Sequence, residues 1–174
     1  MIGRPRNLVL VGLSGTGKSR VGRLVAERLH WRFVDTDAEI ERRAGRTVQE
    51  IFASDGEARF RALEREVVTR VARGAGAVIA TGGGALLDEA NRRALFNHNL
   101  VVCLRASPEA IAARLAHTRE RRPLLEGGDL LSAVRTLAER RAPLYALAHE
   151  TIDTEDRTLG EVANAVVEVF RRYV

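Results

Sequence analysis

Residues 7–29 place a short apolar run, a glycine-rich turn and an amphipathic segment in succession, and this order constrains the fold more than any other feature of the chain. The run NLVLVG (7–12) is apolar enough for a buried strand, and apolar residues recur at helical spacing from Lys18 to about Leu29. Between them, GLSGTGKS (12–19) matches the pattern G-x-x-x-x-G-K-[ST] in the strand-to-helix context that this pattern requires. The stretch therefore predicts a phosphate-binding loop for a nucleoside triphosphate.

The residue types within this loop suit phosphate chemistry. Glycine permits positive φ, so that successive backbone N–H groups can converge on phosphate oxygens, and the N-terminus of the following helix adds partial positive charge. Lys18 is the only lysine among the 28 lysine and arginine residues, and its compact ammonium suits the β- and γ-phosphates better than a planar guanidinium. The Ser19 hydroxyl can bind Mg²⁺. We therefore expect nucleotide contacts from Ser14, Gly15, Thr16, Gly17, Lys18 and Ser19.

The rest of the chain alternates short apolar runs with longer amphipathic segments. Four further strands are expected, at 32–35, 77–81, 100–104 and 150–153. Helices are expected at 36–45, from a capping box at 47–50, and at about 57–73, 88–96, 107–117, 129–141 and 158–172. Pro143 is expected to break or kink the helix that begins near Asp129. Strands this apolar favour a parallel sheet covered by helices on both faces, so the fold class is α/β.

Composition limits the class of protein. The 174 residues fit one domain, no run reaches the roughly 18 apolar residues of a membrane span, and no signal-peptide pattern is present. The single cysteine, Cys103, excludes an intramolecular disulfide and is expected to be a buried thiol, with the cytoplasm as the compartment. The net charge of +5 comes from arginines scattered among 23 acidic residues, which favours solvated helix faces over nucleic-acid binding. Salt-sensitive binding to DNA stays open as an alternative.

Two carboxylates follow the second expected strand, in the sequence Asp35-Thr36-Asp37. The carboxyl ends of strands in open α/β sheets face the ligand crevice. One carboxylate can therefore hold Mg²⁺, directly or through water, while the other accepts a proton from a substrate hydroxyl or orients it. N-capping of the next helix by Thr36 or Asp37 is the alternative interpretation.

Further candidate binding residues lie in three places. Arg61 has Glu57 and Glu64 at helical spacing, so these carboxylates can hold its guanidinium ready for a substrate carboxylate; an ordinary surface ion pair is the alternative. The glycines Gly82–Gly84 follow the third strand and favour a close approach of a ligand to the backbone, with a plain loop as the alternative. The basic segment 118–128 is typical of a mobile lid that supplies charge to a transferring phosphoryl group.

Taken in order, the stretches GLSGTGKS, FVDTDAEIE, IFASDGEARFR, IATGGGA, RPLL and RRAPLY resemble the successive motifs of the shikimate kinase family, over about residues 7–160. The resemblance implies a single domain over 1–174 with a three-layer P-loop kinase fold. Its parallel sheet would have five strands in the order 2-3-1-4-5, with a substrate-binding insertion at about 36–64 and a mobile lid at about 118–128. It implies transfer of the γ-phosphoryl group of ATP, with Mg²⁺, to the 3-hydroxyl of shikimate. We expect a monomer that binds these small molecules and neither nucleic acid nor membrane.

The resemblance also implies roles for individual residues. Shikimate would be bound by Asp37 (the candidate base), by Arg61 and Arg141 on its carboxylate, and by Gly82, Gly83 and Gly84. Magnesium would be served by Ser19 and Asp35. The transferring phosphoryl group would be held by Lys18 and Arg122, with Arg114 and Arg157 near the adenine and ribose.

Two other functions stay open at this stage. A related kinase for gluconate would share the phosphate loop and the lid, although Arg61, Gly82–Gly84 and Arg141 favour a rigid cyclic acid. A non-catalytic ligand sensor on the same fold is the other, although the expected catalytic positions are filled and no helix-turn-helix extension is present.

Overall fold

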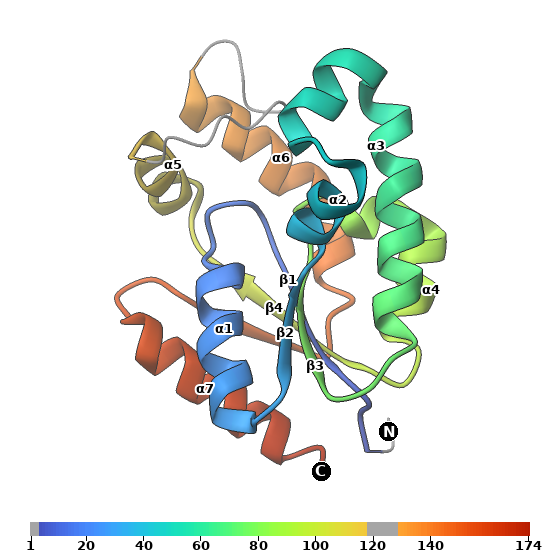
Figure 1. Cartoon of the computed structure of the whole chain (residues 1–174). Helices are drawn as coiled ribbons and strands as arrows, with labels where there is room; N and C mark the ends of the chain where they lie inside the picture. The colour runs from blue at the N-terminus through green and yellow to red at the C-terminus, as the bar shows by residue number, and fades with distance from the viewer. Residues whose placement is uncertain (1–3, 118–128) are drawn as a thin grey trace.

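Five parallel strands run through the centre of the fold in the order β2-β3-β1-β4-β5 (Figure 1), as expected. In this computed structural model the described residues are 4–117 and 129–174. Leu8 lies level with Val78 on one side and Leu100 on the other, which places β1 at the centre of the sheet. The strands are β1 (Leu8–Val11), β2 (Arg32–Asp35), β3 (Ala77–Ala80), β4 (Leu100–Arg105) and β5 (Glu150–Asp153).

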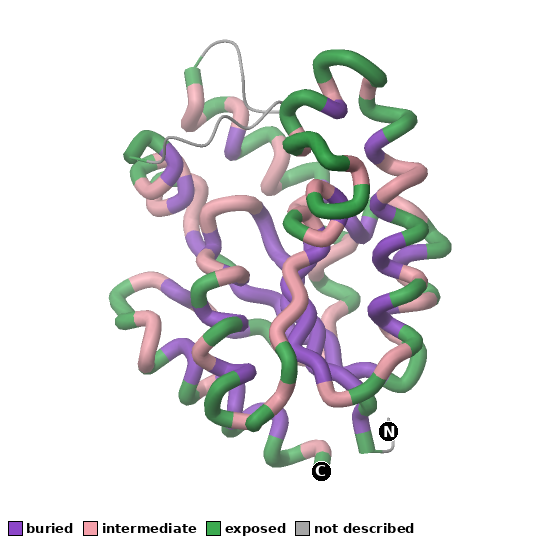
Figure 2. The backbone as a smooth tube through the Cα atoms, in the orientation of Figure 1, coloured by how far each residue is buried: buried purple, intermediate pink, exposed green. Residues whose placement is uncertain are grey.

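Helices cover both faces of this sheet, because successive side chains of a strand point to opposite sides. Leu8 and Leu10 of β1 pack with α1 and α7, whereas Val9 and Val11 pack with α3, α4 and α6. Figure 2 shows the central strands buried along their length. The helices are α1 (Lys18–Leu29), α2 (Thr36–Ala44), α3 (Val48–Ala72), the 3₁₀ turn η1 (Ala85–Leu87), α4 (Glu89–Phe96), α5 (Pro108–Ala116), α6 (Leu130–Tyr145) and α7 (Leu159–Arg171). Within residues 4–117 and 129–174, none of them has both the length and the apolar composition needed to cross a membrane.

The helices agree with the sequence expectation at one notable place and differ at another. Residues Val48–Ala72, labelled α3, are two helical stretches joined by a kink at Gly56, where φ is 82° and ψ is 172°, as the capping box at Thr47 and the expected second helix from about residue 57 predicted. Helix α6 was expected to end near Arg141, and this was wrong, since it continues past Pro143 to Tyr145. A proline this close to the end of a helix removes one backbone donor and leaves the preceding turns intact.

The parallel arrangement brings the carboxyl ends of the strands to one edge of the sheet. The phosphate loop follows β1, Asp35 and Asp37 lie at and just after the end of β2, and Gly82–Gly84 follow β3. Helices α5 and α6 close this edge from the other side, because they share an apolar cluster with Leu13 of the loop. The predicted motifs therefore lie together at this edge, because each follows the carboxyl end of a parallel strand.

Candidate active site

The phosphate loop has the backbone that its sequence predicted. Gly12, Gly15 and Gly17 have φ of 139°, 87° and 90°, and a Cβ at Gly12 would lie 2.3 Å from the carbonyl oxygen of Leu104. Helix α1 begins at Lys18, so its positive N-terminal end faces the loop. The side chain of Lys18 is only 7% exposed and folds back over the loop.

Lys18 Nζ donates to the carbonyl oxygens of Gly12 and Leu13, each at 2.8 Å. The ammonium thus already lies inside the turn, where phosphate oxygens can take over from these carbonyls. Thr16 is also buried and donates from its hydroxyl to Leu13 O at 2.8 Å. These contacts tie the side chains of Lys18 and Thr16 to the backbone of the loop.

The Ser19 hydroxyl donates to the carboxylate of Asp35, which joins the start of α1 to the end of β2. The other oxygen of Asp35 accepts from the backbone N–H of Asp37 and Ala38, at 3.0 and 3.2 Å. Asp35 is therefore the N-cap of α2, and the alternative that gave this role to Thr36 or Asp37 was wrong. Thr36 Oγ1 instead accepts from Gly82 N at 3.1 Å, linking the ends of β2 and β3.

Ser19 and Asp35 together present a hydroxyl and a carboxylate beside the phosphate loop. Hard oxygen ligands of this kind fit Mg²⁺, which keeps several waters and takes one or two protein ligands plus substrate phosphates. No group of three or more histidine, cysteine, aspartate or glutamate side chains suited to a metal occurs in the part of the chain that the structure describes. The pair fits a magnesium ion held jointly with a nucleotide.

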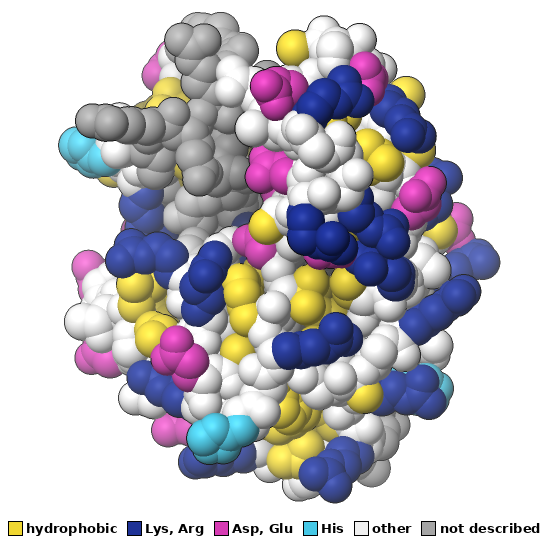
Figure 3. All heavy atoms as spheres, in the orientation of Figure 1, with side chains coloured by type: hydrophobic (Ala, Val, Ile, Leu, Met, Phe, Trp, Pro, Cys, Tyr) yellow, Lys and Arg dark blue, Asp and Glu magenta, His cyan; other side chains and the backbone are white. Residues whose placement is uncertain are grey.

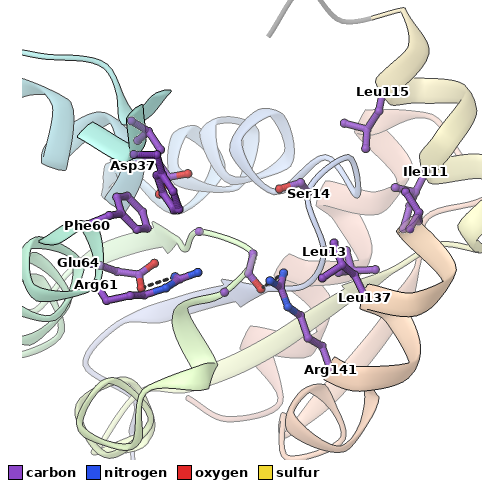
Figure 4. Close-up of a pocket in the computed structure, with 16 residues that line it drawn as sticks. Leu13, Ser14, Asp37, Phe60, Arg61, Glu64, Ile111, Leu115, Leu137 and Arg141 are labelled. Atoms are coloured by element: carbon purple, nitrogen blue, oxygen red, sulfur yellow. Dashed lines mark hydrogen bonds and ion pairs between the residues drawn. The ribbon is translucent and has the colours of Figure 1, made fainter. Parts of the chain in front are cut away.

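A cleft opens next to the phosphate loop (Figure 4). Arg61 and Asp37 enter it from one side, while Arg141 and Ser14 enter it from the other. Its wall brings together the residues predicted for the acceptor, namely Asp37, Arg61, Gly82, Gly83, Gly84 and Arg141. Apolar side chains complete it, namely Leu13, Val48, Phe52, Phe60, Ile111, Leu115, Val134 and Leu137.

Arg61 is held by the two carboxylates that its spacing predicted. Its Nη1 donates to Glu64 Oε2 at 2.7 Å, and its Nη2 lies 3.3 Å from Glu57 Oε1. Glu64 is fully buried, and burial raises the pKa of this carboxyl group against the opposing effect of Arg61. Because the partner is buried and the guanidinium faces the cleft, the surface ion pair considered as an alternative is not what the structure contains.

The three glycines lie where a side chain would enter the cleft. A Cβ at Gly84 would lie 2.6 Å from Arg61 Nη2, and one at Gly82 would lie 2.8 Å from Asp37 Oδ1. At Gly83, a Cβ would meet the backbone N of Ser14 at 3.2 Å and Arg141 Nη1 at 3.4 Å. The glycine stretch thus lies where Asp37, Arg61, Arg141 and the phosphate loop come together.

Arg141 projects from α6 and is 93% buried, with 7% of its surface exposed. Its Nη1 donates to the carbonyl oxygen of Gly83 at 3.0 Å, and the hydroxyl of Tyr145 donates to the same oxygen at 2.6 Å. Tyr145 was missed by the sequence reasoning, although it stands one helical turn after Arg141. The expected break at Pro143 concealed the common helix face that carries both residues.

The arginines expected near the nucleotide base, Arg114 and Arg157, differ in their surroundings. Arg114 of α5 donates to Gly15 O at 3.3 Å and to Thr154 Oγ1 at 3.1 Å, so it ties the phosphate loop to the segment after β5. Arg157 is exposed just before α7. Arg122 and the expected lid at 118–128 lie outside the described residues. The single cysteine, Cys103, is buried as expected, and burial raises the pKa of its thiol to about 11.

Comparison with known proteins identifies the family. The family model described as shikimate kinase matches residues 14–171. A shikimate kinase of Symbiobacterium thermophilum is 51% identical over 164 residues, which are 93% of this chain and 94% of that protein. A solved shikimate kinase from Acinetobacter baumannii, in complex with shikimate, has a TM-score of 0.92 at 36% identity, covering 97% of this chain and 94% of that one.

A gluconokinase from Sinorhizobium meliloti has a TM-score of 0.62 over 98% of this chain and 94% of that one. At 21% identity this likeness concerns the fold alone. The family model, by contrast, matches residues 14–171, and the relative from S. thermophilum is 51% identical over 93% of this chain. These two matches therefore concern the family as well as the fold. The chain belongs to the shikimate kinase family.

Proposed function

We propose that the chain transfers the γ-phosphoryl group of ATP to the 3-hydroxyl of shikimate, giving shikimate 3-phosphate and ADP. The observation that carries this proposal is the cleft in Figure 4, where Arg61 and Arg141 face each other across a space bordered by Asp37 and the phosphate loop. Two converging guanidinium groups suit a carboxylate. The similar protein from A. baumannii was solved in complex with shikimate, which carries a carboxylate.

The phosphate loop holds the donor. Backbone N–H groups of residues 14–19 bind the phosphates, and the ammonium of Lys18 moves from the loop carbonyls to the β- and γ-phosphate oxygens. Ser19 and Asp35 would hold Mg²⁺, which would supply positive charge to the transferring group. Arg114 bonds to the phosphate loop at Gly15 O and also to the hydroxyl of Thr154. Arg157 lies in the same segment as Thr154, between β5 and α7.

The opposite side of the cleft holds the acceptor. Arg61 and Arg141 bind the carboxylate, and the backbone of Gly82–Gly84 allows the ring to lie against the chain. Asp37 binds the hydroxyl that reacts and accepts its proton as the phosphoryl group is transferred. Phosphoryl transfer depends on positioning and charge more than on covalent chemistry, so these contacts account for the reaction.

The protein acts in this proposal as a cytoplasmic monomer, with residues 1–174 forming one domain whose segment 36–64 contributes the acceptor side. The distribution of charge on the protein surface supports the proposal that nucleic acid is not a partner. On the face drawn in Figure 3, basic side chains lie among acidic and apolar ones. Several exposed arginines are paired with carboxylates, as in Arg65–Asp88 and Arg135–Glu109, both at 2.5 Å.

A coupled assay of ADP release, with shikimate or gluconate as the acceptor, tests the proposal. We expect turnover that requires shikimate and Mg²⁺ and a product phosphorylated on the 3-hydroxyl, identified by ³¹P and ¹H NMR. Turnover with gluconate alone would favour the related polyol kinase. Binding of ATP and shikimate by calorimetry with no turnover of either acceptor would favour a ligand sensor.

A further inference from the structure

The hydroxyl of Tyr145 occupies a position that the proposed chemistry has not used. It comes from the last turn of α6 and donates to Gly83 O at 2.6 Å, across 62 positions of sequence. The same carbonyl accepts from Arg141 Nη1 at 3.0 Å. A carbonyl oxygen has two lone pairs, so both donors can bond to it at once, and the pair clamps one peptide of the cleft floor.

That peptide lies between the two halves of the site. Gly83 approaches both Ser14 of the phosphate loop and Arg141, with a Cβ position 3.2 Å from Ser14 N and 3.4 Å from Arg141 Nη1. Because the peptide unit is planar and trans, fixing the Gly83 carbonyl also fixes the start of Gly84, whose Cβ position lies 2.6 Å from Arg61 Nη2. A rotation of this one peptide would therefore disturb both arginines of the acceptor site.

The Tyr145 ring is held by packing and by its hydroxyl together. The ring packs against two apolar clusters and also borders a second hollow, with Cys103, Ala142 and Ala146 among the lining residues. Apolar packing has no preferred direction, so the bond from the hydroxyl to Gly83 is the directional contact between this side chain and the active site.

We propose that Tyr145 is a positioning residue for the acceptor, which acts by holding the Gly83–Gly84 peptide and, through the shared carbonyl, the guanidinium of Arg141. The inference rests on the proposed function, because it concerns how shikimate is held. Burial raises the pKa of the Tyr145 hydroxyl to about 12, so the group stays a protonated donor throughout the pH range of an assay. The role is therefore geometric and independent of pH.

The test is Tyr145→Phe, which removes the hydroxyl and keeps the ring. Gly83 O keeps its bond from Arg141, so the loss is that of one neutral hydrogen bond, and we expect the shikimate KM to rise roughly threefold to tenfold. The Kd for shikimate, measured by calorimetry without nucleotide, should rise by a similar factor. The ATP KM and kcat should stay within about twofold, and the melting temperature should stay close to that of the unaltered chain.

A matched control is Tyr173→Phe, since the chain has two tyrosines. The Tyr173 hydroxyl lies 3.5 Å from Glu150 Oε1, beyond the end of α7 and remote from the cleft. This variant should match the unaltered chain in every constant. A shikimate KM and Kd unchanged in Tyr145→Phe would overturn the inference, and so would equal changes in the KM of both substrates. If the unaltered chain itself failed to phosphorylate shikimate, the proposed function would be at fault instead.

Discussion

Replacing Gly84 by alanine places a methyl group against the guanidinium of Arg61. The added Cβ would lie 2.6 Å from Nη2 and 2.8 Å from Nη1. Gly84 has φ of −102° and ψ of 5°, a conformation open to alanine. The substitution therefore acts on Arg61 rather than on the backbone, and it tests whether the position of this guanidinium determines acceptor binding.

The size of the effect follows from the contacts of Arg61. Ordinary contact begins near 3.4 Å, so the guanidinium must withdraw by about 0.8 Å. The 2.7 Å bond to the buried Glu64 then lengthens or bends. Hydrogen bonds to charged groups contribute about 1.5–3 kcal/mol, and partial loss of this one predicts a free energy of unfolding lower by about 1–2 kcal/mol. Because the displaced guanidinium is one that binds the carboxylate of shikimate in the proposed function, we expect the shikimate KM to rise by about tenfold to a hundredfold.

Steady-state kinetics with each substrate varied in turn, together with urea denaturation, measure both effects. Gly160→Ala is the matched control, because its Cβ would lie 3.8 Å from the nearest atom, Arg28 Nη2, at the start of α7. That variant should keep the kinetic constants and be as stable or slightly more stable. The reasoning is refuted if Gly84→Ala leaves the shikimate KM unchanged, or if the ATP KM rises as much as the shikimate KM.

Three further substitutions test other parts of the structure. Lys18→Arg should lower kcat/KM for ATP by about two orders of magnitude, because the buried space beside Gly12 O suits an ammonium; near-normal activity would show that a guanidinium suffices there. Asp37→Asn should lower kcat by about a hundredfold to ten-thousandfold while calorimetry finds ATP binding intact, and an unchanged kcat would remove Asp37 from proton transfer. Glu39→Gln should reduce stability by about 1 kcal/mol at neutral pH, a small value because its partner Arg42 is mostly exposed. The hydrogen bond from Arg42 is the largest cause that lowers the pKa of Glu39 from 4.5 to about 2. Its stabilising contribution is therefore present above 4.5 and lost as pH falls toward 2, so thermal melts of the two proteins should converge over that range.

Contacts that are local in sequence were predictable because they follow from helical and turn geometry. The phosphate loop is one continuous stretch with its own positive-φ glycines, and Lys18 lies at the start of the helix that follows it. The pairing of Arg61 with Glu57 and Glu64 depends on spacings of three and four residues along one helix. Such features can be predicted without knowing which distant segments of the chain pack against them.

Features that depend on packing between distant segments were less accessible. The spacing showed that Glu64 could meet Arg61, but it did not show that Glu64 is fully buried. Asp35 was expected to serve magnesium, and only the structure showed that it caps α2 and bonds to Ser19 at the same time. The role of Tyr145 stayed hidden because its partner, Gly83, lies on a loop after another strand.

By itself, the sequence determined that this protein binds a triphosphate on a parallel α/β sheet, since the loop motif, the apolar strands and the helical periods are each written in consecutive residues. The order of its motifs also indicated the family. Only the tertiary structure decided how the candidate acceptor site is built. Asp37, Gly83 and Arg141 are far apart in the chain, and they meet because parallel strands end at one edge and Arg141 reaches Gly83 from α6. Distances across such a cleft depend on strand order and helix packing, which local propensities do not specify.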